Sequence, residues 1–118
     1  MSLPIRALLF VAGIAVAAGP ALGHHSLSQQ FDLMQSIMLT GTVTKVDWSN
    51  PHVRLYLDTG SARSDVMHWE LEMSSPNQLI LHGIKFDNLR RGDRITVTAH
   101  PARDGSNWGF AQKIKLAK

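Results

Sequence analysis

The chain has 118 residues, 44% hydrophobic and 18% charged, so it is long enough for one globular domain and its composition argues against disorder. The formal net charge is +3 and the basic residues are scattered, which argues against a nucleic-acid-binding surface. No cysteine is present, and this excludes disulfides, thiolate metal sites, cysteine-linked haem and a lipid-attachment cysteine.

The first 23 residues have the features of a secretory signal peptide. Arg6 supplies a positive charge, residues 7–18 form a continuous apolar run, and Ala21 and Gly23 are small residues placed for a signal peptidase. The apolar run is shorter than the roughly 20 residues that a membrane-spanning helix needs. We therefore expect cleavage between Gly23 and His24, export to the periplasm or beyond, and no membrane span in the mature chain. The alternative is an uncleaved anchor.

Residues 24–36 form a polar lead-in that contains one apolar group. Phe31, Leu33 and Met34 make up this group, and we expect them to anchor the lead-in to the domain. Strand patterns begin at residue 37, so residues 37–118 are assigned to the folded domain.

Five segments have the alternating or β-branched patterns of strands, namely residues 37–48, 53–58, 66–73, 94–100 and 109–116. The apolar phase changes between Val43 and Val46, which predicts a β-bulge near Thr44 and Lys45. A serine followed by a proline, Ser75-Pro76, predicts the start of a short helix between the third and fourth strands. This order is typical of an all-β, five-stranded, OB-fold-like Greek-key barrel. An SH3-like barrel or a small sandwich is the alternative.

Several short motifs give the chain a family resemblance, among them His24-His25-Ser26, Asn50-Pro51-His52, Ser75-Pro76-Asn77 and Arg91-Gly92-Asp93. Together they resemble a family of small exported proteobacterial proteins that carry a domain of unknown function. More loosely, the chain is similar to exported bacterial OB-fold proteins that bind small ligands. The resemblance implies an exported location and a barrel fold, and it implies no activity.

Three histidines form the first candidate site. Cleavage after Gly23 gives His24 a free α-amine beside its imidazole, and His25 follows directly. Imidazole nitrogen suits copper and zinc, and His52 can supply a third nitrogen from the rigid Asn-Pro turn. The pattern predicts a copper or zinc site made by His24, His25 and His52. The alternative is a solvated tail and a turn histidine that bonds to the backbone.

A strand face provides the second candidate. His68, Glu70 and Glu72 lie side by side because alternate residues of a strand share a face. The three could form another metal site or a general acid–base site, and the alternative is an ordinary solvent face.

The barrel surface provides the third candidate. Arg54 and Tyr56 lie on the strands with which OB-folds contact ligands. Trp48 and Trp69 are expected to be core residues, although Trp48 could also offer stacking, and Trp108 is expected to be the exposed aromatic residue because glycine, asparagine and serine surround it.

No catalytic motif is present, so we expect a binding protein and not an enzyme. The first hypothesis is an exported protein that binds copper or another divalent metal. The alternative is a non-metal OB-fold module that binds a partner protein, a saccharide or a small anionic ligand. Nucleic acid is not the expected partner.

Overall fold

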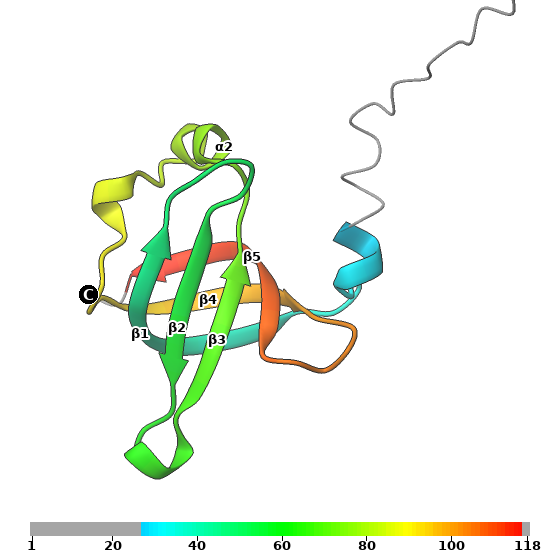
Figure 1. Ribbon diagram of the computed structural model, residues 1–118, viewed down its shortest axis with the longest axis vertical. Helices are drawn as coiled ribbons and strands as arrows, with labels where there is room; N and C mark the ends of the chain where they lie inside the picture. Colours follow the sequence, from blue (N-terminus) through cyan, green and yellow to red (C-terminus); the bar gives the residue numbers. More distant parts are fainter. Residues whose placement is uncertain (1–26, 117–118) are drawn as a thin grey trace, which may run out of the picture.

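Five strands close into a barrel in the computed structural model, which describes residues 27–116 (Figure 1). The order around the barrel is β1-β2-β3-β5-β4, and β1 also pairs with β4. Only the β3–β5 pairing is parallel among these strands. The strands are β1 (Ile37–Asp47), β2 (Arg54–Thr59), β3 (Met67–Glu72), β4 (Arg94–Pro101) and β5 (Trp108–Leu116). The predicted all-β, five-stranded barrel is confirmed. The predicted signal peptide, with His24 and His25, lies outside the described residues.

The first strand curves around the barrel and pairs with two neighbours. Val43 lies opposite Leu57, but Lys45 lies opposite Tyr56, so one extra residue is inserted at the predicted bulge. A Cβ atom at Gly41 would collide with the backbone carbonyl of β2, so only glycine fits where β1 passes from β4 to β2.

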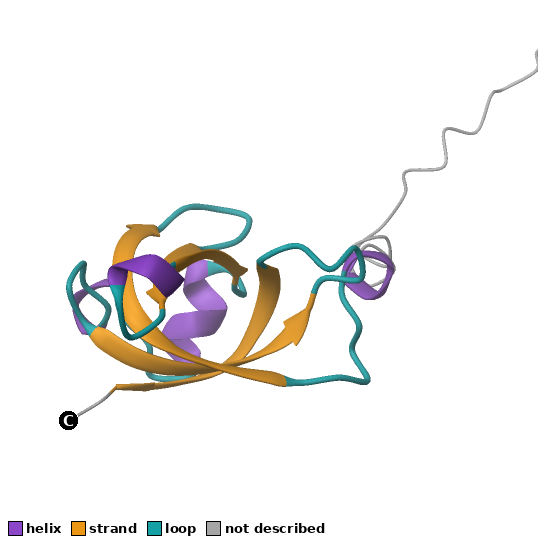
Figure 2. Cartoon of the chain, turned by 90° about the horizontal axis from the view of Figure 1, so that it is seen from below, coloured by secondary structure: helices purple, strands orange, loops and turns teal. Residues whose placement is uncertain are grey.

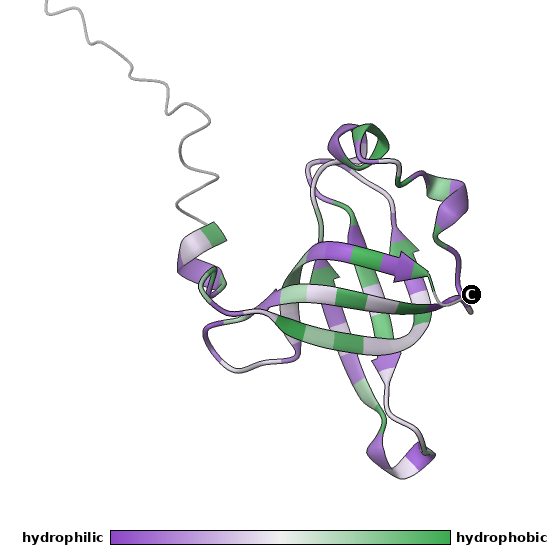
Figure 3. Ribbon diagram, turned by 180° about the vertical axis from the view of Figure 1, so that it is seen from behind, coloured by the Kyte–Doolittle hydropathy of each residue, from purple (hydrophilic) through white to green (hydrophobic). Residues whose placement is uncertain are grey.

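Aliphatic side chains fill the interior of the barrel. Buried positions alternate with more exposed ones along β2 and β4, as period-two patterning requires, and Figure 3 shows the same alternation in hydropathy. Trp48 and Trp69 pack against this core, as expected. The buried core consists of Val43, Val53, Leu55, Leu57, Leu71, Met73, Leu79, Leu89, Ile95, Val97 and Ala99.

A short helix, α2 (Pro76–Leu81), lies between β3 and β4 as predicted. The Ser75 hydroxyl accepts a hydrogen bond from the Gln78 amide at 3.3 Å and caps the helix, and Leu79 is buried in the core. Figure 2 shows the helix behind the ring of strands, at one end of the barrel. Among the residues that the structure describes, no helix is long and apolar enough to cross a bilayer.

Two 3-10 turns complete the connections. The first, η1 (Arg63–Asp65), lies in the β2–β3 hairpin, and the second, η2 (Phe86–Asn88), lies between α2 and β4.

The segment before β1 is anchored to the outside of β5. Residues 27–30 are helical, and Phe31 is fully buried with its ring centroid 4.4 Å from that of Trp108 and 5.9 Å from that of Phe110. The amide of Asp32 also donates to the carbonyl of Pro101 at 2.9 Å. This segment therefore packs against the barrel next to the β4–β5 connection (Figure 1).

Two expectations about this region need correction. Of the proposed apolar anchor group only Phe31 is buried, because Leu33 is 37% exposed and Met34 is 93% exposed. Trp108 is not the exposed aromatic residue, because the ring of Phe31 covers it. The large exposed aromatic side chain in the described part of the chain is Phe86, at 59%.

Candidate functional site

The outer surface of β2 and β3 carries a continuous row of polar side chains. Their positions follow from strand alternation, because Leu55, Leu57 and Leu71 take the inward positions. The antiparallel register places each outward residue of β2 opposite one of β3. We call this surface the β2–β3 polar face, and it consists of His52, Arg54, Tyr56, Asp58, His68, Glu70 and Glu72.

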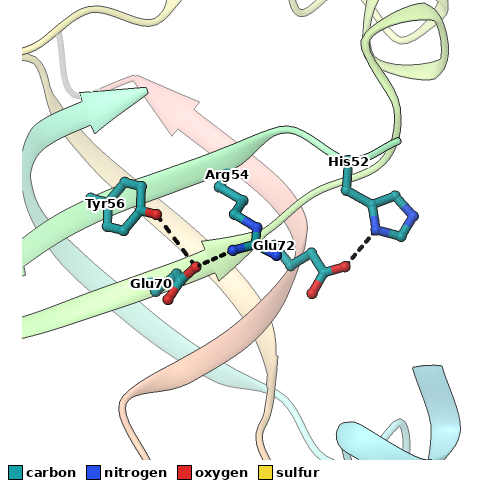
Figure 4. A network of polar contacts seen from close by, with 5 residues as sticks. All are labelled: His52, Arg54, Tyr56, Glu70 and Glu72. Atoms are coloured by element: carbon teal, nitrogen blue, oxygen red, sulfur yellow. Dashed lines mark hydrogen bonds and ion pairs between the residues drawn. The ribbon is translucent and has the colours of Figure 1, made fainter. Parts of the chain in front are cut away.

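One end of the polar face is a histidine–carboxylate pair (Figure 4). His52 Nδ1 lies 2.5 Å from Glu72 Oε1, and the exposed fractions of the two side chains are 45% and 13%. An ionised carboxylate can only accept a hydrogen bond, so Nδ1 is the donor. When the ring is neutral, this hydrogen bond leaves the lone pair on Nε2 and orients the ring. This is the state in which an imidazole can act as a metal ligand.

The centre of the polar face is organised around Glu70 (Figure 4). Its carboxylate accepts hydrogen bonds from Arg54 Nη1 at 3.2 Å and from the Tyr56 hydroxyl at 3.5 Å. On the other side of Tyr56, Lys45 Nζ lies 5.4 Å from the centroid of the phenol ring. Arg54 therefore compensates the charge of Glu70, and this carboxylate is already used within the protein.

The opposite end repeats the histidine–carboxylate pair. His68 Nδ1 lies 2.5 Å from Asp58 Oδ1, and the histidine is 81% exposed. Asp58 lies six positions after His52, which corresponds to about 20 Å along a strand, so the two pairs cannot share an ion. His68, Glu70 and Glu72, predicted as one possible site, thus each bond to a different partner.

A complete metal site is not formed within residues 27–116. No group of three or more histidine, aspartate or glutamate side chains there is close enough to hold a metal ion. His52 lies within the described residues and is oriented by its contact with Glu72, whereas His24 and His25 lie outside the described residues. The predicted ligand set of His24, His25 and His52 therefore remains a prediction.

The anchored N-terminal segment lies one strand away from Glu70 and Glu72. These two glutamates are the register partners of Trp108 and Phe110 on β5, and adjacent strands are about 4.8 Å apart. The ring of Phe31 lies against both Trp108 and Phe110, with the shorter centroid distance to Trp108. Phe31 therefore holds the segment beside the centre and the His52 end of the polar face.

The sequence identified some residues of this surface and missed others. Arg54 and Tyr56, predicted as ligand contacts, do lie together on it, but Trp48 and Trp108 do not. Asp58 was not predicted, because its pairing with His68 depends on a hairpin register in which Thr59 lies opposite Met67.

Comparison with known proteins identifies the fold. The mitochondrial single-stranded DNA-binding protein Rim1 of S. cerevisiae is similar in two crystal forms, with TM-scores of 0.56 and 0.54. The sequences are 13% and 14% identical, and the alignments cover 71% of this chain and 94% and 93% of Rim1. At such identities the likeness shows the OB-fold alone.

The search of curated proteins found no match. The sequence profile of one family matches residues 11–112, which is most of the chain. The chain therefore belongs to the family of unknown function DUF6152.

Proposed function

We propose that this protein is an exported binding protein that holds a copper or zinc ion through His24, His25 and His52. The observation that carries the proposal is the hydrogen bond from His52 Nδ1 to Glu72. A carboxylate that accepts from one ring nitrogen fixes a histidine with the other nitrogen free, and metal-binding histidines commonly have such a partner. His52 is also half exposed, so an ion can approach Nε2.

The anchoring of the N-terminal segment supports the same site. Phe31 packs beside β5, next to the strand that carries Glu72. His24 lies three positions before residue 27, and three extended residue steps span at most about 10 Å. An anchor on this side of the barrel favours ligands from His24 and His25 at the His52 end of the polar face.

Export is part of the proposal, because it determines the chemistry of His24. The signal-peptide features of residues 1–23 support cleavage after Gly23, which frees the α-amine of His24. The amine and the imidazole of one residue can then chelate copper, with a further nitrogen from His52. Nitrogen ligands of this kind suit copper above other divalent ions of the first transition series.

A copper(II) titration followed by electron paramagnetic resonance tests the proposal. The protein should be exported natively so that it begins at His24, and compared with a chain that has one methionine before His24. We expect one tightly bound ion with nitrogen hyperfine structure in the chain that begins at His24. The extended chain should bind copper at least about tenfold more weakly, a loss of ~1.4 kcal/mol in binding free energy. Equal affinity would exclude the α-amine as a ligand. Weak copper binding with no defined stoichiometry would exclude the metal site.

The second candidate is a non-metal ligand on the centre of the polar face. Arg54 is 52% exposed, and Tyr56 lies beside it on the strands that OB-folds use for binding. A saccharide or a partner protein fits this surface better than single-stranded DNA, the ligand in the names of the fold neighbours, because three carboxylates repel phosphate.

Fluorescence anisotropy with labelled oligothymidylate separates these options. We expect no saturable binding at physiological salt. Saturable binding that is lost in Arg54→Gln would instead assign the face to nucleic acid.

A further inference from the structure

A groove of about 530 Å³ lies between the bulge of β1 and the segment that joins α2 to β4. It shares no residue with the β2–β3 polar face as defined above, and its principal side chains come from separate parts of the chain. They are Lys45 on β1, Phe86 on η2, and Leu89, Arg90 and Arg91 before β4.

Both walls of this groove are fixed by hydrogen bonds. The Asn88 side chain accepts from the Lys85 amide at 3.1 Å and closes the η2 turn, and Leu89 is 4% exposed and anchors the segment in the core. The Val43 amide then donates to the Asp93 carbonyl at 2.8 Å, which attaches the next turn to β1. The groove is therefore formed before any ligand arrives, as small-molecule sites usually are.

Arg90 is held so that its charged end stays available. Its amide donates to Asp93 Oδ2 at 2.9 Å and its Nε donates to the Asp87 carbonyl at 3.2 Å. Within residues 27–116 neither Nη group has a hydrogen-bond or ion-pair partner. A positioned guanidinium with free Nη groups is suited to bind a carboxylate or phosphate through two hydrogen bonds.

The charge and the apolar surface of the groove complement Arg90. Lys45, Arg90 and Arg91 carry three positive charges, and Asp87 is the one acidic side chain that lines the described groove. Phe86 is 59% exposed, and its ring contacts Trp48 edge-on with centroids 6.1 Å apart. An exposed ring held next to cations offers a surface for an apolar group attached to an anion.

We propose that this groove binds a small organic anion in which a carboxylate or a phosphate ester is joined to an apolar ring. Arg90 binds the oxyanion, Lys45 and Arg91 attract it, and Phe86 packs against the ring. This site is independent of the proposed metal site.

An amide-resolved NMR titration of the chain beginning at His24, in the presence of EDTA, tests the groove. The probes are benzoate and phenyl phosphate, with inorganic phosphate as the probe without a ring and benzyl alcohol as the probe without a charge. We expect saturable shifts of the amides of residues 86–91 with benzoate or phenyl phosphate. The probe that binds more tightly, benzoate or phenyl phosphate, identifies the preferred oxyanion. Both control probes should bind at least about tenfold more weakly than that probe.

Variants distinguish binding in the groove from non-specific attraction by surface charge. Arg90→Gln should weaken phenyl phosphate about tenfold or more, because a charged hydrogen bond is lost. Phe86→Ala should weaken the ring-bearing probes and leave inorganic phosphate unchanged. Arg63→Gln, a change of an exposed arginine in the distant β2–β3 hairpin, is the matched control and should have no effect.

Three results would overturn the proposal. They are the absence of saturable shifts, equal effects of Arg90→Gln and Arg63→Gln, and binding of inorganic phosphate as tight as that of phenyl phosphate. The copper titration decides the metal site separately, because these variants should keep wild-type copper affinity.

Discussion

The two ends of the β2–β3 polar face carry the same chemical pair in different surroundings. At each end a histidine Nδ1 lies 2.5 Å from a carboxylate oxygen. Glu72 is 13% exposed and adjoins the strand that holds the N-terminal segment, whereas His68 is 81% exposed beside a hairpin. A hydrogen bond prepares an imidazole for a metal, but further ligands must come from elsewhere in the chain. Of the two ends, the His52 end is the one whose carboxylate pairs with a strand that Phe31 packs against.

The largest expected effect comes from removing the anchor of the N-terminal segment. Phe31→Ala empties a fully buried site between Trp108 and Phe110, so the free energy of unfolding should fall by ~3 kcal/mol or more. Copper affinity should fall as well, because the segment before β1 is no longer held against β5, the strand next to Glu72. Urea denaturation and copper titration measure the two effects.

The matched control is Met34→Ala, because Met34 is 93% exposed in the same segment. Its stability should stay within ~0.5 kcal/mol of wild type. If Phe31→Ala also stayed within that range, the ring would not be the anchor.

The next effect compares the two histidines directly. His52→Ala should weaken copper binding about 100-fold, or ~2.7 kcal/mol, because one ligand is lost. His68→Ala should leave the affinity unchanged, although His68 has the same carboxylate contact. Competition with a chelator of known affinity measures both variants. Equal losses would mean that the two ends do not differ in the way proposed.

A smaller effect is expected from the carboxylate partners. Glu72→Gln keeps the size of the side chain but weakens the hydrogen bond that orients His52, and copper affinity should fall about tenfold. Asp58→Asn makes the equivalent change at His68 and should not alter the affinity. A loss in both variants would point to the overall charge of the face as the cause.

The smallest effect concerns pH at the hairpin near His68. Hydrogen bonds from the backbone amides of Ala62 and Ser61 lower the pKa of Asp65 below its ordinary value of 3.8. A folded pKa below the unfolded one stabilises the hairpin above about pH 4, and this contribution is lost as the pH falls through the folded pKa.

Amide hydrogen exchange of residues 61–65 measures that contribution. Asp65→Asn should exchange faster than wild type at pH 6, and the difference should shrink towards pH 3. A difference that does not change with pH would show that charge is not involved. The carboxylate is exposed, so the effect should stay local.

The strands and the helix of the barrel could be predicted from the sequence because the residue patterns that specify them are local. The alternation of β2 and β4, the phase change after Val43 and the Ser75-Pro76 helix start each lie within a few residues. The end of the helix near Gly83 follows from its positive φ of 84°.

The contacts of the candidate site are not local, and this explains what was missed. His52 and Glu72 are 20 residues apart, so their hydrogen bond depends on the register of β2 and β3. Phe31 covers Trp108 from the other end of the chain, and the polar turn around Trp108 gave no sign of that contact. Arg90 belongs to a groove only because its turn is attached to the bulge of β1.

Lys45 connects the groove with the centre of the β2–β3 polar face. Its ammonium group stands 5.4 Å from the ring of Tyr56 at the centre of the polar face, and the same side chain lines the groove. Tyr56 is the single tyrosine of the chain. Biosynthetic 3-fluorotyrosine would therefore place one fluorine nucleus on the polar face, beside the Lys45 side chain that also lines the groove. A single resonance could then report the occupancy of both sites in one sample.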